Sequence, residues 1–357
     1  MTTEIVVLIT AVIGLITAII AFLSRPIRPP ATTRVEPPPA DPEDANYIET
    51  TVWERSPIRM PDQGNAKGYP IVLSVVAMKG GVGKSTIAAN LAAHFSATPQ
   101  NKKVLLIDFD YQSNLSVTVM NHIGVTDVAM TSHKLLIGKE EPGVTVLRAP
   151  ANHIRRQDAG RVSAFTAHYS LATVENELMS EWLRSPDGRE IRFNLRRYLA
   201  SEPFVRQFDM VVIDCPPRLT TGAINALTAS THLLIPTLLD NLSAPAAVYF
   251  SRQLVRMRPT LFPTVKLVGV VPSITTRATA LTDREVRVAG SIEDELATIW
   301  PQHARAKDRR VVMKEAFVPR TGPIGDAAGL GLAYFRNAAA KTIFSRLGME
   351  VEERLNA

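Results

Sequence analysis

Residues 78–86 read MKGGVGKST and follow a short apolar run, Ile71–Ala77. We expect a strand over the apolar run and a helix over 85–96, which places the glycines in the turn between them. Glycine backbones can curl so that several N–H groups point at one anion, and the helix adds its positive N-terminal end. The stretch therefore predicts a phosphate-binding loop. The residues expected to hold phosphate or its metal ion are Gly80, Gly81, Val82, Gly83, Lys84, Ser85 and Thr86.

Three side chains of this loop have separate expected roles. Lys84 reaches the β- and γ-phosphates and assists their transfer, and the Ser85 hydroxyl is a ligand of Mg²⁺. Thr86 hydrogen-bonds the α-phosphate. The alternative is a glycine-rich turn that contains a lysine by chance, and it does not account for the strand before the loop and the helix after it.

Short apolar runs alternate with helical stretches along the chain beyond residue 68. This alternation favours an α/β fold with a doubly wound, mostly parallel sheet and helices on both faces. Ligands of such sheets bind at the carboxyl ends of the strands. The expected strands are 71–77, 104–107, 144–147, 210–213, 233–235 and 267–271, and the expected helices include 85–96, 172–183, 191–199 and one that begins at a capping box, Thr282–Glu285.

Acidic residues follow two of the expected strands. Residues 104–115 read VLLIDFDYQSNL, and residues 208–217 read FDMVVIDCPP. Asp108 and Asp110 lie two positions apart and therefore on the same face of a strand end, and Asp214 ends the second run. Taken alone, these acids fit a capped strand end as well as they fit a site.

The glycine loop also departs from the general pattern GxxxxGK[ST], because Met78 stands where that pattern has glycine and a second lysine, Lys79, follows it. It resembles the deviant Walker A loop of the ParA/MinD family of P-loop ATPases, and the two acidic segments resemble that family's second motif and its Walker B strand. The resemblance covers roughly residues 70–345 and thins between 121 and 205.

The resemblance implies roles for five residues. Lys79 would reach across a dimer to the partner's nucleotide and act in catalysis, Asp110 would position the attacking water, Asp108 would assist near Mg²⁺, Asp214 would contact Mg²⁺ through a water, and Pro319 would lie beside the adenine. The implied cofactors are ATP and Mg²⁺. The implied behaviour is a homodimer formed on ATP binding, with slow hydrolysis that an unknown partner protein stimulates.

Three outputs of such an ATPase are open from the sequence. One is ParA-like DNA or plasmid partition, or positioning of another cargo, and another is a membrane-tethered MinD-like scaffold that recruits a protein and ignores DNA. A third, a kinase or redox relative, is disfavoured. The last tyrosine is Tyr334, so the Tyr-rich tail of bacterial tyrosine kinases is missing, and the single cysteine, Cys215, cannot supply two cluster ligands per subunit. Cys215 is better explained as a small buried side chain.

Composition adds one further expectation about partners. Of 357 residues 46% are hydrophobic and 21% charged, which suits a folded core, and the formal net charge is +6. Residues 251–357 hold 17 Lys and Arg against 11 Asp and Glu, so the last third carries the whole excess. This asymmetry favours nonspecific DNA binding as strongly as it favours a solvated surface. The cluster expected to meet phosphates is Arg305, Lys307, Arg309 and Arg310.

The first 67 residues read as an attachment to a membrane. Residues 5–23 carry no charge and, as a helix, match the thickness of a bilayer, so residues 1–24 are expected to be a single transmembrane anchor in the inner membrane. Arg25, Arg28 and Arg34 follow this run, which places the rest of the chain in the cytoplasm. Seven prolines fall between residues 26 and 42, so 25–67 is expected to be a Pro-rich linker. The ATPase domain is expected over 68–357, with a family-specific insert at about 121–205.

Overall fold

The computed structural model describes residues 52–61, 68–99, 102–123, 131–137, 152–153, 161–185, 189–300, 310–327 and 330–356. The predicted anchor over 5–23 and the linker up to residue 51 lie outside these residues. No helix in the described part is both long and apolar enough to cross a bilayer. Residues 52–356 belong to one compact unit.

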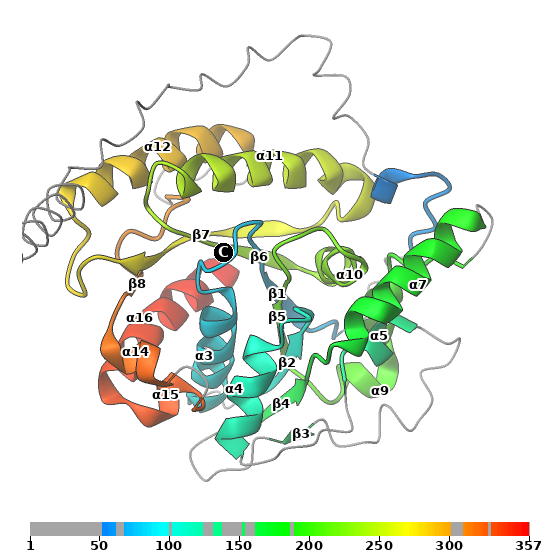
Figure 1. The fold of residues 1–357 in the computed structure, drawn as a ribbon, viewed down its shortest axis with the longest axis horizontal. Coiled ribbons are helices and arrows are strands. Elements are labelled where there is room, and N and C mark those ends of the chain that lie inside the picture. The colour runs from blue at the N-terminus through cyan, green and yellow to red at the C-terminus, as the bar shows by residue number, and fades with distance from the viewer. Residues whose placement is uncertain are drawn as a thin grey trace, which may run out of the picture. The chain divides into compact units, whose positions relative to one another are not determined.

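Eight described strands form one sheet in the order β3-β4-β2-β5-β1-β6-β7-β8 (Figure 1). All neighbouring pairs are parallel except β3 with β4, which confirms the mostly parallel sheet predicted from the alternation. The strands are β1 (Ile71–Val75), β2 (Lys103–Asp108), β3 (Asn152–His153), β4 (Arg161–Phe165), β5 (Met210–Asp214), β6 (His232–Thr237), β7 (Lys266–Thr275) and β8 (Val318–Pro319).

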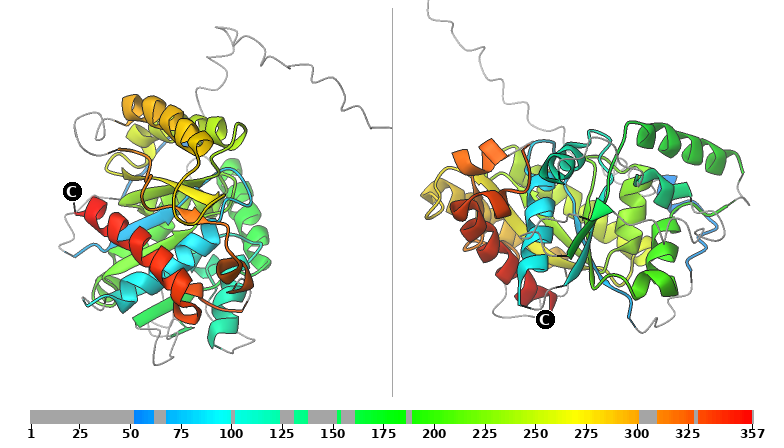
Figure 2. Two further views of the ribbon diagram at one scale, coloured as in Figure 1. Left: turned by 90° about the vertical axis from the view of Figure 1, so that its left-hand side faces the viewer. Right: turned by 90° about the horizontal axis from the view of Figure 1, so that it is seen from below.

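Helices cover both faces of this sheet, as the sequence predicted (Figures 1 and 2). One face carries α3 (Lys84–Ala97), α4 (Asn114–Ile123), α14 (Gly322–Ala327), α15 (Ala333–Arg336) and α16 (Ala338–Leu355). The other carries α5 (His133–Ile137), α7 (Ser170–Arg184), α8 (Asn194–Ala200), α9 (Glu202–Val205), α10 (Thr221–Ala229), α11 (Ser243–Leu261) and α12 (Asp283–Ile299).

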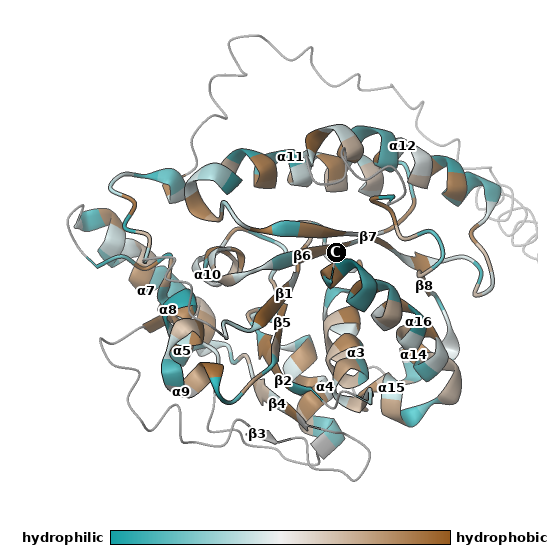
Figure 3. Cartoon of the chain, turned by 180° about the vertical axis from the view of Figure 1, so that it is seen from behind, coloured by the Kyte–Doolittle hydropathy of each residue, from teal (hydrophilic) through white to brown (hydrophobic). Residues whose placement is uncertain are grey.

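The strands explain why both faces are covered. Along β5, Val211 and Ile213 join the core on the α10 side, whereas Met210 and Val212 join the core on the α3 side. A strand that is apolar on both faces has to be buried on both, and the central strands are correspondingly hydrophobic in Figure 3. The predicted capping box is also present, since Thr282 and Glu285 exchange hydrogen bonds at the start of α12.

The insert departs in part from its prediction. The helix expected over 172–183 is confirmed as α7, whereas the one expected over 191–199 begins only at Asn194, in α8. The strand β4 was not expected, and the strand expected over 144–147 lies outside the described residues.

The folded unit also begins before the boundary expected at residue 68. Residues 52–61, which we call the N-terminal strap, pack on α7 and on the segment before α8, and within them Val52–Glu54 form a short 3₁₀ helix, η1. Trp53 is buried, and Ile58 and Met60 pack against the same core. The composition of 25–67 indicated a linker, but its end carries the apolar groups that fix it to the domain.

Candidate functional site

The MKGGVGKST loop connects β1 to α3 at the carboxyl edge of the sheet. Gly81 and Gly83 have φ angles of 74° and 80°, in the left-handed region that glycine tolerates best. A Cβ built on Gly80 meets nothing within 4 Å, so the space beside the loop is open. Val82 is buried, which leaves its backbone as the part able to face a ligand. These features suit a cradle for an anion at the start of a helix.

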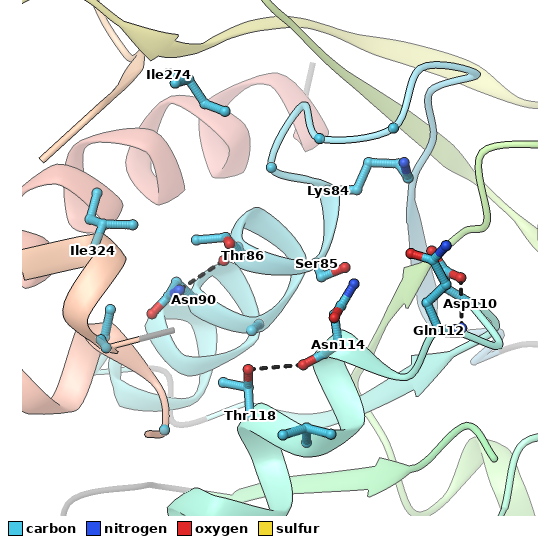
Figure 4. A pocket seen from close by; sticks show the side chains of 18 of the residues that line it. Lys84, Ser85, Thr86, Asn90, Asp110, Gln112, Asn114, Thr118, Ile274 and Ile324 are labelled. Carbon is cyan, nitrogen blue, oxygen red and sulfur yellow. Dashed lines mark hydrogen bonds between the residues drawn. The ribbon is translucent and has the colours of Figure 1, made fainter. Parts of the chain in front are cut away.

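A cavity of about 500 Å³ lies beside this loop (Figure 4). Among the described residues it is lined from the loop and α3 by Gly80, Gly81, Gly83, Lys84, Ser85, Thr86, Ala89 and Asn90, from the segment after β2 and from α4 by Asp110, Gln112, Asn114, Val117 and Thr118, and from elsewhere by Pro217, Ile274, Ile324, Ala327, Gly331 and Ala333. The loop residues that the sequence proposed for phosphate, apart from Val82, therefore meet at one cavity. The Lys84 ammonium donates a hydrogen bond to the Lys79 carbonyl across the loop, at 3.3 Å.

The three predicted carboxylates gather at the same edge of the sheet because of strand register. Asp108 of β2 stands opposite Asp214 of β5, which stands opposite Val75 of β1, three residues before the loop begins. Asp110 is nearly buried and lines the cavity, and its Oδ1 accepts a hydrogen bond from the Gln112 amide at 3.0 Å. Asp110 is therefore placed to orient a small molecule inside the cavity.

Asp214 shows that a cation and its ligands fit this site. The side chain is fully buried, and neither carboxylate oxygen accepts a hydrogen bond of good geometry from the described residues. Burial and the nearby Asp108 raise the pKa of Asp214 well above its ordinary value, while Ser85 and Lys84 lie close enough to oppose that rise. A fully buried carboxylate is costly even with Ser85 and Lys84 close by, and a divalent cation held by Ser85 with phosphate oxygens would reduce that cost.

Asp108, predicted to assist near Mg²⁺, has a dense set of hydrogen bonds within the chain. Its Oδ1 accepts a hydrogen bond from the Asp110 amide at 2.9 Å, and its Oδ2 accepts from the Ser116 amide and hydroxyl at 3.0 and 2.6 Å. Burial raises the pKa of Asp108, and the Ser116 hydrogen bonds oppose the rise. These hydrogen bonds connect Asp108 to Asp110 and to the start of α4; like Asp214, Asp108 does not line the cavity, and its role near Mg²⁺ stays a prediction.

The wall opposite the phosphate loop is apolar and comes from the C-terminal part of the domain. Ile324 of α14 and Ile274 of β7 face the cavity, together with Val117 of α4 (Figure 4). Ile274 has a φ angle of 53°, which is rare for a β-branched residue. Such backbone conformations cluster at functional sites. The predicted adenine contact, Pro319, lies in β8 beside Thr275 and does not line the cavity. Its contact with adenine stays a prediction.

Lys79 points away from the cavity of its own chain. Its ammonium donates to the Ser243 hydroxyl at 2.6 Å, and that hydroxyl donates to Asp240 at 2.8 Å. Although burial opposes it, hydrogen bonds from the Ser243 and Leu242 amides, with the Lys79 charge nearby, hold the pKa of Asp240 below its ordinary value. Lys79 thus has a defined resting place at the start of α11.

Residues 215–220, which we call the switch loop, follow β5 and bring Pro217 to the cavity. Two residues that the sequence analysis did not single out support this loop. Glu175 of α7 accepts hydrogen bonds from the Thr220 hydroxyl and the Gly222 amide at 2.5 and 2.6 Å, and burial raises the pKa of Glu175. Trp53 of the strap donates to the Leu219 carbonyl. An acidic residue on the buried face of a predicted helix was the one available signal for Glu175.

The remaining predictions concern Cys215 and the basic residues. Cys215 is buried, and burial raises the pKa of its thiol, as expected of a packed side chain. Of the cluster expected to meet DNA, Arg310 alone is described, and Arg305, Lys307 and Arg309 lie outside the described residues. Several other basic residues of the last third form ion pairs within the domain, namely Arg252, Arg256, Lys314 and Arg354.

Comparison with known proteins places this geometry in a family. A model of the AAA_31 family, described as an AAA domain, matches residues 71–261, more than half of the chain. The chain belongs to this family. The AAA_31 match runs from β1 to the end of α11 and so includes the phosphate loop, all three carboxylates and the switch loop.

Three similar proteins narrow the type of AAA_31 member. The chromosome partitioning protein ParA of Caulobacter vibrioides is 28% identical over 296 residues, which cover 79% of this chain and 94% of that protein. The structure of the cell division ATPase MinD of Pyrococcus furiosus matches with a TM-score of 0.54 and 21% identity, covering 79% and 98%. Cobyrinic acid a,c-diamide synthase of Mycobacterium smegmatis, solved with ADP and magnesium, matches with a TM-score of 0.58 and 23% identity, covering 81% and 96%.

The AAA_31 chain is therefore a P-loop ATPase of the ParA/MinD type. The two solved structures share its fold, and they carry names of different activities. For this reason the fold does not by itself say what the ATPase is used for, and the task has to be argued from the residues.

Proposed function

We propose that this chain is a ParA-type switch ATPase that dimerises when it binds ATP and Mg²⁺ and separates after slow hydrolysis. The observation that carries the proposal is the buried carboxylate of Asp214, which has Ser85 and Lys84 close by and accepts no hydrogen bond of good geometry from the described residues, together with a glycine loop that leaves open space. This arrangement suits a metal-bound triphosphate.

Each residue of the site has one task in this proposal. The loop amides and Lys84 hold the phosphates, and Ser85 holds Mg²⁺, with Asp214 behind it. Asp110, fixed by the Asp108 network, orients a water for attack. Lys79 leaves Ser243 and places its charge on the partner's nucleotide, where negative charge develops during transfer.

Light scattering of the full chain with nucleotide tests the proposal. The wild type should be a dimer with a non-hydrolysable ATP analogue and Mg²⁺, and a monomer with ADP. Asp110→Ala should bind ATP, fail to hydrolyse it and stay dimeric, because the water is no longer oriented. Lys79→Ala should bind nucleotide without dimerising. A wild type that stays monomeric with the analogue, or a Lys79→Ala variant that dimerises normally, would refute the proposal.

For the output we propose cargo positioning or DNA partition, supported by the ParA relative and the excess positive charge. Binding to a DNA fragment should then require ATP and weaken steeply with added salt. A membrane-tethered, MinD-like scaffold is the second candidate. It is favoured by the apolar run over 5–23 and by the ion pairs that occupy four of the basic residues. A fluorescent fusion of the full chain, compared with one lacking residues 1–24, separates a nucleoid pattern from a membrane pattern and also tests the proposed inner-membrane location.

A further inference from the structure

The switch loop is supported from outside the nucleotide cavity. Its Pro217 lines the cavity, whereas Leu219 and Thr220, two and three positions later, contact the strap and α7. Neither supporting segment belongs to the phosphate loop or to the two acidic motifs. The position of this loop beside the nucleotide is therefore set by residues that those motifs do not include.

Trp53 makes the first of these contacts. Its indole N–H donates to the Leu219 carbonyl at 3.1 Å, and its ring stacks on Trp182 of α7 with centroids 5.8 Å apart and planes at 13°. The side chain is 5% exposed. A buried, stacked indole ring can hold a backbone carbonyl in one position through its N–H, because the ring cannot move without losing its stacking contact.

Arg192 fixes the strap that carries Trp53. It is fully buried, and its guanidinium donates to the carbonyls of Trp53, Arg55 and Pro57 at 2.7 to 2.9 Å and to the Glu190 carboxylate. The planar, five-donor guanidinium thus determines the path of the strap. Arg192 therefore holds the backbone of the strap from which the Trp53 side chain extends to the switch loop.

Glu175 makes the second contact. Its Oε1 accepts from the Thr220 hydroxyl and from the Gly222 amide, at the point where the switch loop becomes α10. A Cβ built on Gly222 would come within 2.8 Å of this oxygen, so Glu175 approaches more closely than a side chain at position 222 would permit. Both ends of the segment from Leu219 to Gly222 are thereby held from outside.

We propose that Trp53 and Glu175 are positioning residues for hydrolysis. They hold the switch loop in the position that keeps Pro217 correctly placed relative to Asp110 across the nucleotide cavity. The inference rests on the proposed ATPase function. It adds that a strap before the family domain and a helix in the insert set the rate of ATP hydrolysis.

The first experiment compares Trp53→Phe with Trp300→Phe in the full chain. Phenylalanine keeps an aromatic ring against Trp182 and deletes the N–H donor. Trp300 is also fully buried, but its ring N–H has no partner among the described residues, which makes it a matched control. For Trp53→Phe we expect kcat to fall about three- to tenfold, the equivalent of one hydrogen bond, with KM for ATP unchanged. Trp300→Phe should leave kcat within about twofold.

A second readout needs no catalysis. Arg218 is exposed in the switch loop, so trypsin can report on the loop directly. Cleavage after Arg218 should be about three- to tenfold faster in Trp53→Phe, while cleavage at the exposed Arg284 and Arg287 of α12 should not change. A wild type without ATP turnover would refute the proposed function and leave the tryptic result to decide whether the loop is held. Unchanged kcat together with unchanged cleavage would overturn the inference.

Glu175 provides an independent test if Trp53→Phe does not fold. Glu175→Gln keeps an oxygen that can accept both hydrogen bonds, whereas Glu175→Ala removes it. We expect Glu175→Ala to lower kcat and expose Arg218, and Glu175→Gln to restore most of the rate. If Gln is as slow as Ala, the charge near Asp110 matters and the positioning role is wrong.

Discussion

The phosphate loop and the switch loop leave neighbouring strands at the same edge of the sheet, since Val75 of β1 pairs with Asp214 of β5. The phosphate loop is shaped by its own residues, through left-handed glycines and the helix that follows them. The switch loop is shaped by distant residues, because Trp53 lies 166 positions away from its contact and Glu175 lies 45 positions away.

This difference explains which loop a sequence can disclose. A loop that is determined by adjacent residues has a recognisable pattern, because the residue types and their spacing are the structure. A loop that is held by remote side chains has no such pattern, because its supports are scattered along the chain. The comparison also predicts that changes on the strap side affect stability and rate, whereas changes in the phosphate loop affect binding.

The largest effect is expected from Arg192→Ala, which attacks the strap side. The substitution removes the guanidinium that neutralises the buried Glu190 carboxylate and that donates to three carbonyls of the strap, and it should cost about 3–5 kcal/mol of unfolding free energy. Urea unfolding of the full chain measures it. Arg252→Ala removes an exposed ion pair with Glu295 and should cost less than about 1 kcal/mol. If the two variants are equally stable, the strap is not held as described.

The next effect is expected from Lys84→Ala, which attacks the phosphate loop. Loss of its ammonium should weaken binding of a fluorescent ATP analogue about a hundredfold, because a charged partner of the phosphates is removed. Because Lys84 is buried near Asp214, the unfolding free energy of the variant without nucleotide is measured beside its binding, which shows that the protein tested is folded. Lys341→Ala, at an exposed position of α16, is the control and should bind normally. Normal binding by Lys84→Ala would place the nucleotide elsewhere.

Local pattern gave much of this fold. The strands β1, β2, β5, β6 and β7 were predicted because each is a short apolar run buried on both faces. The phosphate loop was predicted because its residues are contiguous. The family resemblance put both Asp108 and Asp214 near Mg²⁺, whereas their pairing across β2 and β5 and the hydrogen bonds of Asp108 needed the structure.

The errors share one cause, which is dependence on contacts far apart in the chain. The strap was assigned to a linker because prolines dominate the segment before it, and nothing local shows that Trp53 meets Trp182. The helix α8 begins at Asn194 instead of residue 191, because the Arg192 side chain is committed to hydrogen bonds with the strap. Ile324 was missed because an isolated isoleucine has no motif, and only the packing of α14 brings it to the cavity.

A pH titration of the unfolding free energy tests a group at the edge of the sheet opposite to the two loops. His232 begins β6, and burial, with Lys266 nearby, lowers the pKa of His232 to about 4 from 6.5. The unfolded chain therefore takes up this proton below pH 6.5 while the folded chain does not. Stability is complete above pH 6.5 and is lost as the pH falls toward 4, by about 2 kcal/mol at pH 5.

Urea unfolding at pH 7.5 and pH 5, in wild type and in His232→Gln, isolates this contribution. The difference between the two pH values should be about 2 kcal/mol smaller in the variant. Equal differences would show that His232 is not the group responsible. Because His232 is far from the phosphate loop along β6, the variant should bind nucleotide as the wild type does at pH 7.5.

The smallest effect is expected from Ser243→Ala, which releases Lys79 from its resting place. The hydroxyl accepts from Lys79 at 2.6 Å, and this contact must break before Lys79 can reach a partner's nucleotide. Its removal should therefore strengthen the dimer formed with a non-hydrolysable analogue about two- to fivefold, the equivalent of one partly exposed hydrogen bond. Asp240 still accepts from the backbone amides of Leu242 and residue 243, so the start of α11 should persist.

Sedimentation of Ser243→Ala beside Ser243→Thr, which keeps the hydroxyl, measures the change. A weaker dimer would mean that Ser243 holds Lys79 in the geometry used across the dimer, and the contact would then be part of the active arrangement instead of a resting one.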